Sequence, residues 1–374
     1  MLAFSKKSKL ILSLILCLAV FAPGFKSNAL SAKAAALICA DTGELLYSKN
    51  AEDRMAMAST TKIMTALLLC ENLSPDKIVK VTSEQIKVEG TSMGLCAGDT
   101  VTAEVLLYGM LLSSGNDAAN VTACAVSGST EKFVELMNKK AQSLNLKNTH
   151  FATPSGLDAA DHYSSAYDMA MLARYALSNE SFAACAAARQ KTVVLNGGEK
   201  KLTLVNHNRL LKTYDDVTGV KTGFTKKAGR CLVSSAVKGK KRVIAVTLND
   251  PDDWADHRKM LDLGLEAVSV QSVEPPCDNL RINVIGGNKS RLCIPIRGYE
   301  ICSAAKADLT CEVNVKQMVF APVKKGENLG NINFYSNGIL IKKSKIIANE
   351  NIKRKKDNIF KNYFDLFICL IGRT

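Results

Sequence analysis

One stretch near the start of the chain, residues 57–69, most constrains what this sequence can fold into. Ser59 stands just before an apolar run that few helix breakers interrupt. Serine is a favoured residue at helix starts, so its hydroxyl is expected at the first turn. Lys62 follows three residues later on the same face of the helix. The stretch therefore predicts a core helix that begins with a serine and a lysine side by side.

This pair has the chemistry of a nucleophile and its base. A serine hydroxyl needs an adjacent base, and a lysine can serve if burial or neighbouring cations keep its amine neutral. The helix N-terminus also favours the negative charge that develops on an attacked carbonyl. The spacing alone is not specific, however, and a plain capped core helix is the alternative. The same Ser-x-x-Lys spacing recurs at Ser74–Lys77, Ser129–Lys132, Ser235–Lys238 and Ser303–Lys306.

The N-terminus has the order of a secretory signal peptide. Three lysines precede an apolar run, residues 10–22, and a small-residue cleavage site follows at 27–29. An uncleaved membrane anchor is the alternative, although the run is short for a bilayer span. We therefore expect residues 1–29 to direct the chain across the cytoplasmic membrane.

The length of the chain limits the number of domains, and the distribution of its charge limits the kinds of binding partner. With 374 residues and 47% hydrophobic residues, the chain can bury a core and is expected to hold about two domains. Much of the formal net charge of +14 lies at the two ends: residues 1–29 carry lysines and no acid, and residues 342–374 are strongly basic. This distribution favours contact with a membrane or wall surface, and no nucleic-acid partner is expected.

Cysteine and histidine give no sign of a disulfide framework or a metal site. Of the twelve cysteines, Cys17 leaves with the signal peptide, and the odd number that remains contains no C-x-x-C pair. Most are expected to be small buried residues. The four histidines match no ligand spacing, so neither a metal nor a cofactor is expected. They are His150, His162, His207 and His257.

Residues 30–270 predict an antiparallel sheet with helices between its opening and closing strands. Two apolar runs flank the turn at 41–44, which is typical of a hairpin. Further strands are expected at 192–195, 201–204, 219–224, 231–236 and 242–248. Helical periodicity is expected at 103–112, 117–126, 131–144, 167–177 and 257–267.

Pro275 and Pro276 mark a linker to a small all-β domain, residues 275–348. Its expected strands are 280–285, 292–296, 310–315, 317–321, 330–335 and 338–341. Residues 349–374 place basic residues beside aromatics and leucines, which suits a helix lying in a membrane interface. A disordered tail is the alternative, and Lys361 and Asp365 interrupt the apolar part.

Two further motifs complete a series with the first. Ser114-Gly115-Asn116 is expected between two helices, and Lys221-Thr222-Gly223 on a strand. This order and these contexts are what the penicillin-recognising serine acyl-transferases need. Four wider segments extend the likeness: 40–50, 149–158, 162–168 and 219–229. With them the chain resembles the serine-type D-alanyl-D-alanine carboxypeptidases, the low-molecular-mass penicillin-binding proteins.

The resemblance implies the fold and the activity. It implies an α/β penicillin-recognising fold plus a small all-β C-terminal domain, in an exported enzyme on the outer face of the membrane. The implied reaction is the penicillin-sensitive removal of the terminal D-alanine from peptidoglycan stem peptides, in cell-wall biogenesis (EC 3.4.16.4). The implied partners are those peptides, β-lactam inhibitors and the membrane surface through the tail.

The resemblance also implies a role for each motif residue. Ser59 is similar to the nucleophile and Lys62 to its base, while Ser114 resembles the proton relay to the leaving D-alanine. Asn116 resembles the residue that orients Lys62 and the substrate amide. The substrate side is implied to consist of Lys221 and Thr222, which hold the terminal carboxylate, Gly223, which allows close approach, and the N–H groups of Ser59 and Phe224, which form the oxyanion hole.

Three other interpretations remain at this stage. The segment Gly90–Gly94 fits the G-x-S-x-G elbow of α/β-hydrolases, but that elbow needs a strand before it and a helix directly after. A β-lactamase of the same fold would need an acid and a water that deacylate the penicilloyl-enzyme, and no such acid stands out. The chain could also be a non-catalytic binder of anionic wall polymers that uses its basic ends. The intact Ser59–Lys62 pair argues against this, because such a protein needs no nucleophile.

Overall fold

The computed structural model describes residues 30–305, 307–355 and 367–368. The expected signal peptide, and residues 356–366 and 369–374 of the expected tail, lie outside these described residues. By its internal contacts the chain separates into Met1–Leu30 and Ser31–Thr374, and the elements below all belong to the second unit. Among the described helices, none has both the length and the apolar character needed to cross a bilayer.

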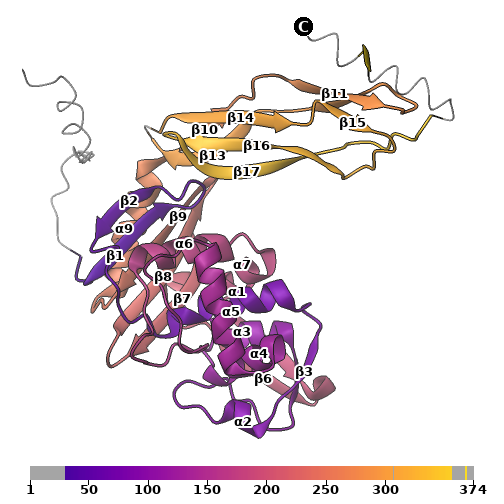
Figure 1. Ribbon diagram of the computed structural model, residues 1–374. Coiled ribbons are helices and arrows are strands. Elements are labelled where there is room, and N and C mark those ends of the chain that lie inside the picture. Colours follow the sequence, from indigo (N-terminus) through magenta and orange to yellow (C-terminus); the bar gives the residue numbers. More distant parts are fainter. Residues whose placement is uncertain (1–29, 306, 356–366, 369–374) are drawn as a thin grey trace, which may run out of the picture. The chain divides into compact units, whose positions relative to one another are not determined.

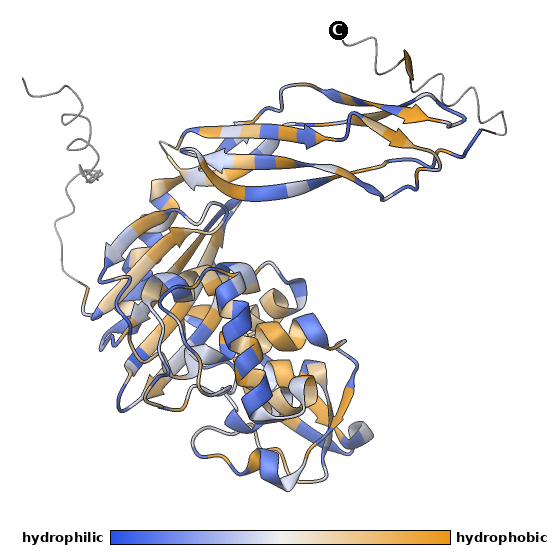
Figure 2. Cartoon of the chain, viewed as in Figure 1, coloured by the Kyte–Doolittle hydropathy of each residue, from blue (hydrophilic) through white to orange (hydrophobic). Residues whose placement is uncertain are grey.

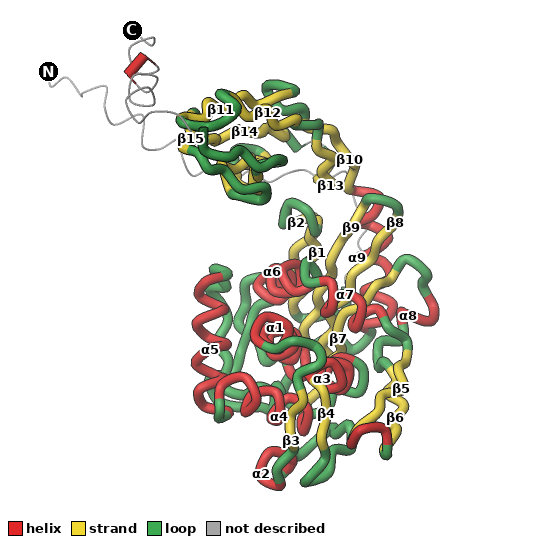
Figure 3. The backbone as a smooth tube through the Cα atoms, turned by 90° about the vertical axis from the view of Figure 1, so that its right-hand side faces the viewer, coloured by secondary structure: helices red, strands yellow, loops and turns green. Residues whose placement is uncertain are grey.

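A five-stranded antiparallel sheet with the order β2-β1-β9-β8-β7 organises residues 31–267 (Figure 3). Its strands are β1 (Ala34–Cys39), β2 (Leu45–Lys49), β7 (Val217–Thr225), β8 (Gly229–Lys238) and β9 (Lys241–Leu248). Every residue of β1 is buried, because both faces of the sheet are covered by helices. The opening hairpin thus pairs with the closing strands, which confirms the expected arrangement.

Helices cover both faces of this sheet, with α9 on one side and α6 and α7 on the other (Figures 1 and 3). The helices are α1 (Lys62–Asn72), α2 (Ser83–Ile86), α3 (Ala103–Leu111), α4 (Asn116–Ser127), α5 (Thr130–Ser143), α6 (Ala166–Ala176), α7 (Glu180–Ala187), α8 (Leu210–Thr213) and α9 (Asp253–Ala267). A 3-10 turn, η1 (Ala58–Thr61), leads into α1, and a second, η2 (Asn196–Gly198), lies in a hairpin turn. Residues 62–69 of α1 are all buried, as its apolar sequence predicts.

Four helices differ from the sequence expectation. The prediction did not include the one-turn helices α2 and α8, nor α7, although Asn179 caps α7 by accepting from the N–H of Phe182. Helix α9 begins at Asp253, four residues before the expected start at His257. Asp253 forms an ion pair with Arg230 at 2.5 Å, and acidic residues suit the first turn of a helix.

Two short strand pairs lie outside the main sheet. They are β3 (Ile78–Lys80) with β4 (Thr100–Thr102), and β5 (Gln190–Leu195) with β6 (Lys200–Val205), the latter as expected. The segment Gly90–Gly94 lies in the loop between α2 and β4, with neither a strand directly before it nor a helix directly after it. The prediction against a hydrolase elbow is therefore confirmed.

The C-terminal part consists of β-strands with a hydrophobic cluster of their own, centred on Ile282, Leu292 and Phe334. Its strands are β10 (Val268–Val273), β11 (Asn279–Ile285), β12 (Arg291–Pro295), β13 (Tyr299–Ala304), β14 (Leu309–Val315), β15 (Met318–Phe320), β16 (Asn328–Ser336) and β17 (Ile339–Ile347). The sequence prediction missed β10 and β13, which pair with each other, and ended β17 too early. Figure 2 shows polar and apolar residues mixed along the strands of this part of the chain.

Candidate active site

Ser59 and Lys62 lie at the start of the buried helix. Ser59 belongs to η1 and Lys62 is the first residue of α1, with 3.0 Å between Lys62 Nζ and Ser59 Oγ. The expected proximity of the two side chains is thus confirmed. The structure differs in the cap, because Met57 and Thr61 hold the cap positions of η1 and α1 and neither makes a side-chain cap hydrogen bond. The Ser59 hydroxyl faces the lysine amine.

Two carbonyl oxygens hold the amine of Lys62. Nζ donates to Asn116 Oδ1 at 2.7 Å and to the backbone oxygen of Ser155 at 2.6 Å. Lys62 has no exposed surface, and this burial lowers the pKa of its amine well below the usual value. The charge of Lys221 lowers the pKa further, whereas that of Asp117 raises it. The balance favours the neutral amine.

Asn116 is fixed by the loop opposite it. It opens α4, its N–H donates to Thr91 O at 2.7 Å, and its Nδ2 donates to Glu89 O, also at 2.7 Å. Because Nδ2 faces that loop, Oδ1 on the other side of the amide points towards Lys62. Ser114 lies just before, buried and with a positive φ of 61°. Within the described residues the hydrogen bonds of Lys62 do not reach Ser114, so its relay role stays a prediction.

Strand β7 carries the third motif. Lys221 is 1% exposed, its Nζ donates to Thr222 O at 2.8 Å, and burial lowers its pKa to about 7. A Cβ atom at Gly223 would lie 3.0 Å from the N of Ser59 and 3.1 Å from Met57 O. Gly223 therefore lets η1 lie directly against the strand, a role that the sequence interpretation gave to the substrate. Phe224, the next residue, is exposed.

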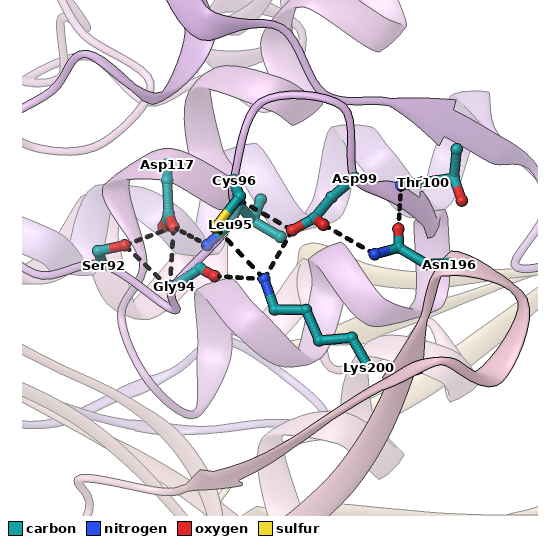
Figure 4. Close-up of polar contacts among 9 residues, drawn as sticks. All are labelled: Ser92, Gly94, Leu95, Cys96, Asp99, Thr100, Asp117, Asn196 and Lys200. Atoms are coloured by element: carbon teal, nitrogen blue, oxygen red, sulfur yellow. Dashed lines mark hydrogen bonds and ion pairs between the residues drawn. The ribbon is translucent and has the colours of Figure 1, made fainter.

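Asp117 holds the loop that fixes Asn116. Its carboxylate accepts from Ser92 Oγ at 2.5 Å and from the N–H groups of Gly94 and Leu95 at 3.1 Å (Figure 4). The N–H of Met93 donates to it as well, at 3.0 Å. Four donors converge on one buried side chain, so residues 92–95 are bound to the first turn of α4. The loop oxygens that Asn116 uses lie immediately before this segment.

A second anchor holds the other end of the same loop. Asp99 accepts from Lys200 Nζ at 2.8 Å, from Asn196 Nδ2 at 2.9 Å and from the N–H of Cys96 at 2.8 Å (Figure 4). Lys200 also donates to Gly94 O at 3.0 Å. The turn of the β5–β6 hairpin is thus hydrogen-bonded to residues 94–99. Asp117 and this turn hold the two ends of the loop.

Sequence reasoning missed several of these groups. The oxygens of Glu89, Thr91 and Ser155 act through the backbone, which leaves no signature in residue type. Asp117 had a signal, since an acidic residue directly after Asn116 suits the first turn of a helix. Ser155 lies in a segment on which the family resemblance was based, but no role came with it.

The structure brings residues of the three motifs together: a Ser-x-x-Lys turn, a Ser-Gly-Asn turn between helices and a Lys-Thr-Gly edge strand. This combination defines the class of penicillin-recognising serine acyl-transferases. The chain belongs to the D-alanyl-D-alanine carboxypeptidase family, whose model matches residues 22–252. Residues 300–354 match the model of the C-terminal domain of penicillin-binding protein 5.

Similar proteins cover most of the chain. A D-alanyl-D-alanine carboxypeptidase of Bacillus subtilis, DacF, is 37% identical over 336 residues, which is 86% of each chain. DacC of Escherichia coli is 33% identical and covers 83% of this chain and 82% of its own length. Among solved structures, penicillin-binding protein 5 of Haemophilus influenzae matches with a TM-score of 0.64, at 25% identity, over 88% of this chain and 100% of that one. The Streptomyces K15 DD-transpeptidase matches with a TM-score of 0.62, at 32% identity, over 65% of this chain and 100% of that one.

Proposed function

We propose that Ser59 is the nucleophile with which this serine-type D-alanyl-D-alanine carboxypeptidase removes the terminal D-alanine from peptidoglycan stem peptides. One observation carries the assignment. The buried amine of Lys62 lies between two carbonyl oxygens and the Ser59 hydroxyl. The two other Ser-x-x-Lys pairs at helix or turn positions, Ser74–Lys77 and Ser129–Lys132, involve exposed lysines.

The three oxygens around Lys62 can be satisfied by a charged or by a neutral amine, and the lowered pKa favours the neutral form. A neutral amine has two protons and one lone pair. Its protons are taken by Asn116 Oδ1 and Ser155 O, the two shorter contacts, and the lone pair then accepts from the Ser59 hydroxyl at 3.0 Å. This is the arrangement of a general base that is ready to take the hydroxyl proton.

The reaction proceeds in two steps. Ser59 Oγ attacks the carbonyl of the penultimate D-alanine while its proton passes to Lys62, and Ser114 relays a proton to the nitrogen of the leaving D-alanine. The N–H groups of Ser59 and Phe224 stabilise the oxyanion. Water then hydrolyses the ester and releases the shortened peptide.

The strand side selects a free C-terminus. Lys221, when protonated, and the hydroxyl of Thr222 hold the terminal carboxylate, since a cation and a hydroxyl give charge-assisted hydrogen bonds. The thiazolidine carboxylate of a penicillin occupies the same position, which makes β-lactams inhibitors. Gly223 keeps this strand close to the Ser59 turn.

The chain acts outside the cytoplasmic membrane. Residues 1–29 export it, residues 30–270 form the catalytic domain, residues 275–348 form the β-domain, and the tail, 349–374, associates with the outer face of the membrane. The basic and amphipathic composition of the tail supports this placement.

The test is intact mass spectrometry after incubation with benzylpenicillin, together with an assay of D-alanine release from a pentapeptide. We expect a long-lived adduct on the Ser59 peptide of the wild type, and none for Ser59→Ala. The matched control is Ser74→Ala, which alters a serine of the same spacing and should change nothing. Penicillin consumed without a lasting adduct would indicate a β-lactamase, and no reaction at all would indicate a wall-binding protein.

A further inference from the structure

The turn between β1 and β2 is hydrogen-bonded to the C-terminal β-strands. Asp41 Oδ2 accepts from the N–H of Cys302 at 3.0 Å, and Glu44 Oε2 accepts from the N–H of Ala304, also at 3.0 Å. The other carboxylate oxygen of Glu44 accepts from Ser336 Oγ at 2.5 Å. The main sheet and the C-terminal strands are therefore joined at a defined place, where β13 contacts the end of β1.

Two cysteines meet at this junction. Cys39 is the last residue of β1, and Cys302 lies in β13, 263 residues later in the chain. Both are free thiols in the structure, with 3.9 Å between their Sγ atoms. Cys39 Sγ also donates to the backbone oxygen of Cys302 at 3.1 Å. Both side chains are buried, with 0% and 1% exposed, so the two sulfur atoms contact each other in the protein interior.

Strand pairing fixes the backbone on both sides of this contact. Cys39 lies opposite Val243 of β9, and its N–H donates to Glu44 O at 2.9 Å. Cys302 lies opposite Val270 of β10. A disulfide bond needs about 2.05 Å between the sulfur atoms, so each of them has to move by about 1 Å. Side-chain rotation can supply a movement of this size while the strands stay paired.

We propose that Cys39 and Cys302 form a disulfide bond that joins the main sheet covalently to the C-terminal β-strands when the chain folds in the presence of a small-molecule disulfide. Neither cysteine belongs to the catalytic groups, so the inference is independent of the proposed function. It assigns a partner to two of the cysteines that the sequence left as separate buried residues.

The bond forms by two thiol–disulfide exchanges. While the junction is still open, the thiolate of one cysteine attacks a sulfur of the small-molecule disulfide, forms a mixed disulfide with it and releases one thiolate. The other cysteine of the pair then attacks the sulfur of the first, which forms the Cys39–Cys302 bond and releases the second thiolate. The two cysteines lose two electrons and two protons, and the small-molecule disulfide is reduced to two thiols. Once the junction has closed, its burial shields the bond from external thiols.

The experiment follows the pair through folding. The full chain is reduced and unfolded in urea with dithiothreitol, then refolded either with reduced glutathione alone or with a mixture of reduced and oxidised glutathione. Labelling with N-ethylmaleimide and digestion without reduction precede mass spectrometry. In most molecules of the second sample we expect a cross-linked peptide of Cys39 and Cys302, with no label on either residue. The Tm of this sample should be about 5 °C higher, because a bond across so long a loop restricts the unfolded chain.

Two variants separate this pair from the other thiols. Cys302→Ala should lose both the cross-linked peptide and the rise in Tm. Cys293→Ala, which removes an exposed thiol from β12, should retain both. The proposal is overturned if Cys39 and Cys302 are labelled as free thiols after refolding with oxidised glutathione, or if Cys39 is linked equally often to other cysteines. If the chain does not refold, incubation of the folded protein for several days in the same mixture with dilute urea replaces refolding, and the same outcomes decide.

Discussion

The site has a helical wall, the start of α1 with Lys62, and a strand wall, β7 with Lys221. Both lysines are almost fully buried, yet their surroundings differ. The amine of Lys62 contacts three oxygens, those of Ser59, Asn116 and Ser155, whereas in the described residues that of Lys221 donates to Thr222 O. The amine of Lys62 is therefore fully hydrogen-bonded within the protein, whereas the amine of Lys221 can still donate to a ligand. The proposal gives one residue type the role of a base in the first setting and of an anion receptor in the second. Burial lowers the pKa of both amines, and the charge of Lys221 lowers that of Lys62 further.

The largest effect should come from removing the amine on the helical wall. Lys62→Met keeps the volume of the side chain but leaves Ser59 without a base, so acylation by benzylpenicillin should slow by about 10³-fold. The time course of the adduct mass measures this rate. Lys77→Met, in an exposed pair of the same spacing, is the control, and a Lys62→Met enzyme that acylates at the normal rate would remove Lys62 from the mechanism.

Removing the amine on the strand wall should raise KM more than it lowers kcat. Lys221→Met takes away the charge that we propose meets the terminal carboxylate, and we expect a loss of about 10- to 100-fold in kcat/KM for a free peptide. A peptide whose C-terminus is amidated carries no such charge and should be cleaved equally slowly by the wild type and the variant. A similar loss on both peptides would mean that Lys221 acts on the chemistry rather than on the carboxylate.

The pH profile should separate the two lysines. The Lys62 amine must be neutral, so kcat/KM falls as pH falls through its lowered pKa, for every substrate. Lys221 must be charged and has a pKa of about 7, so kcat/KM for a free peptide falls as pH rises above that value, by up to about tenfold per unit. Lys221→Arg, which stays protonated, should lose the alkaline limb and keep the acidic one. An alkaline limb that persists in this variant would belong to another group.

Smaller effects should come from the loop behind the helical wall. Asp117→Asn replaces an acceptor of four hydrogen bonds from this loop with an amide that brings its own donors, and we expect a loss of about 1–3 kcal/mol in the free energy of unfolding. Because this loop fixes Asn116, acylation should slow as well. Thermal unfolding and the adduct time course measure the two effects, and normal acylation in a destabilised protein would show that Asn116 does not depend on the loop.

The smallest effect should come from the Lys200–Asp99 ion pair at the other end of the loop. Lys200→Met breaks a partly exposed pair with Asp99, and such pairs contribute about 0.2–1 kcal/mol. Acylation should stay within about twofold of the wild type, since Asn116 contacts the loop before residue 92. A loss as large as that in Asp117→Asn would show that the loop moves as one unit.

The parts of the site that depend on local spacing were predictable. Ser59 and Lys62 are three residues apart, and helix geometry alone brings them together. Long apolar helices such as α1 and α3 were also predicted, because their periodicity or uniform apolarity is strong. The predicted start of α9 was wrong because the ion pair of Asp253 with Arg230, which lies more than twenty residues earlier in the chain, stabilises the first turn.

The sequence by itself determined the family, the order of the three motifs and the identity of their side chains, because residue type and near spacing are written in it. The tertiary structure alone decided which oxygens hold Lys62 and why Asn116 faces it. These features depend on backbone carbonyls of residues 89, 91 and 155, which every residue type possesses. Only the packing of distant segments selects which of those oxygens reach the site.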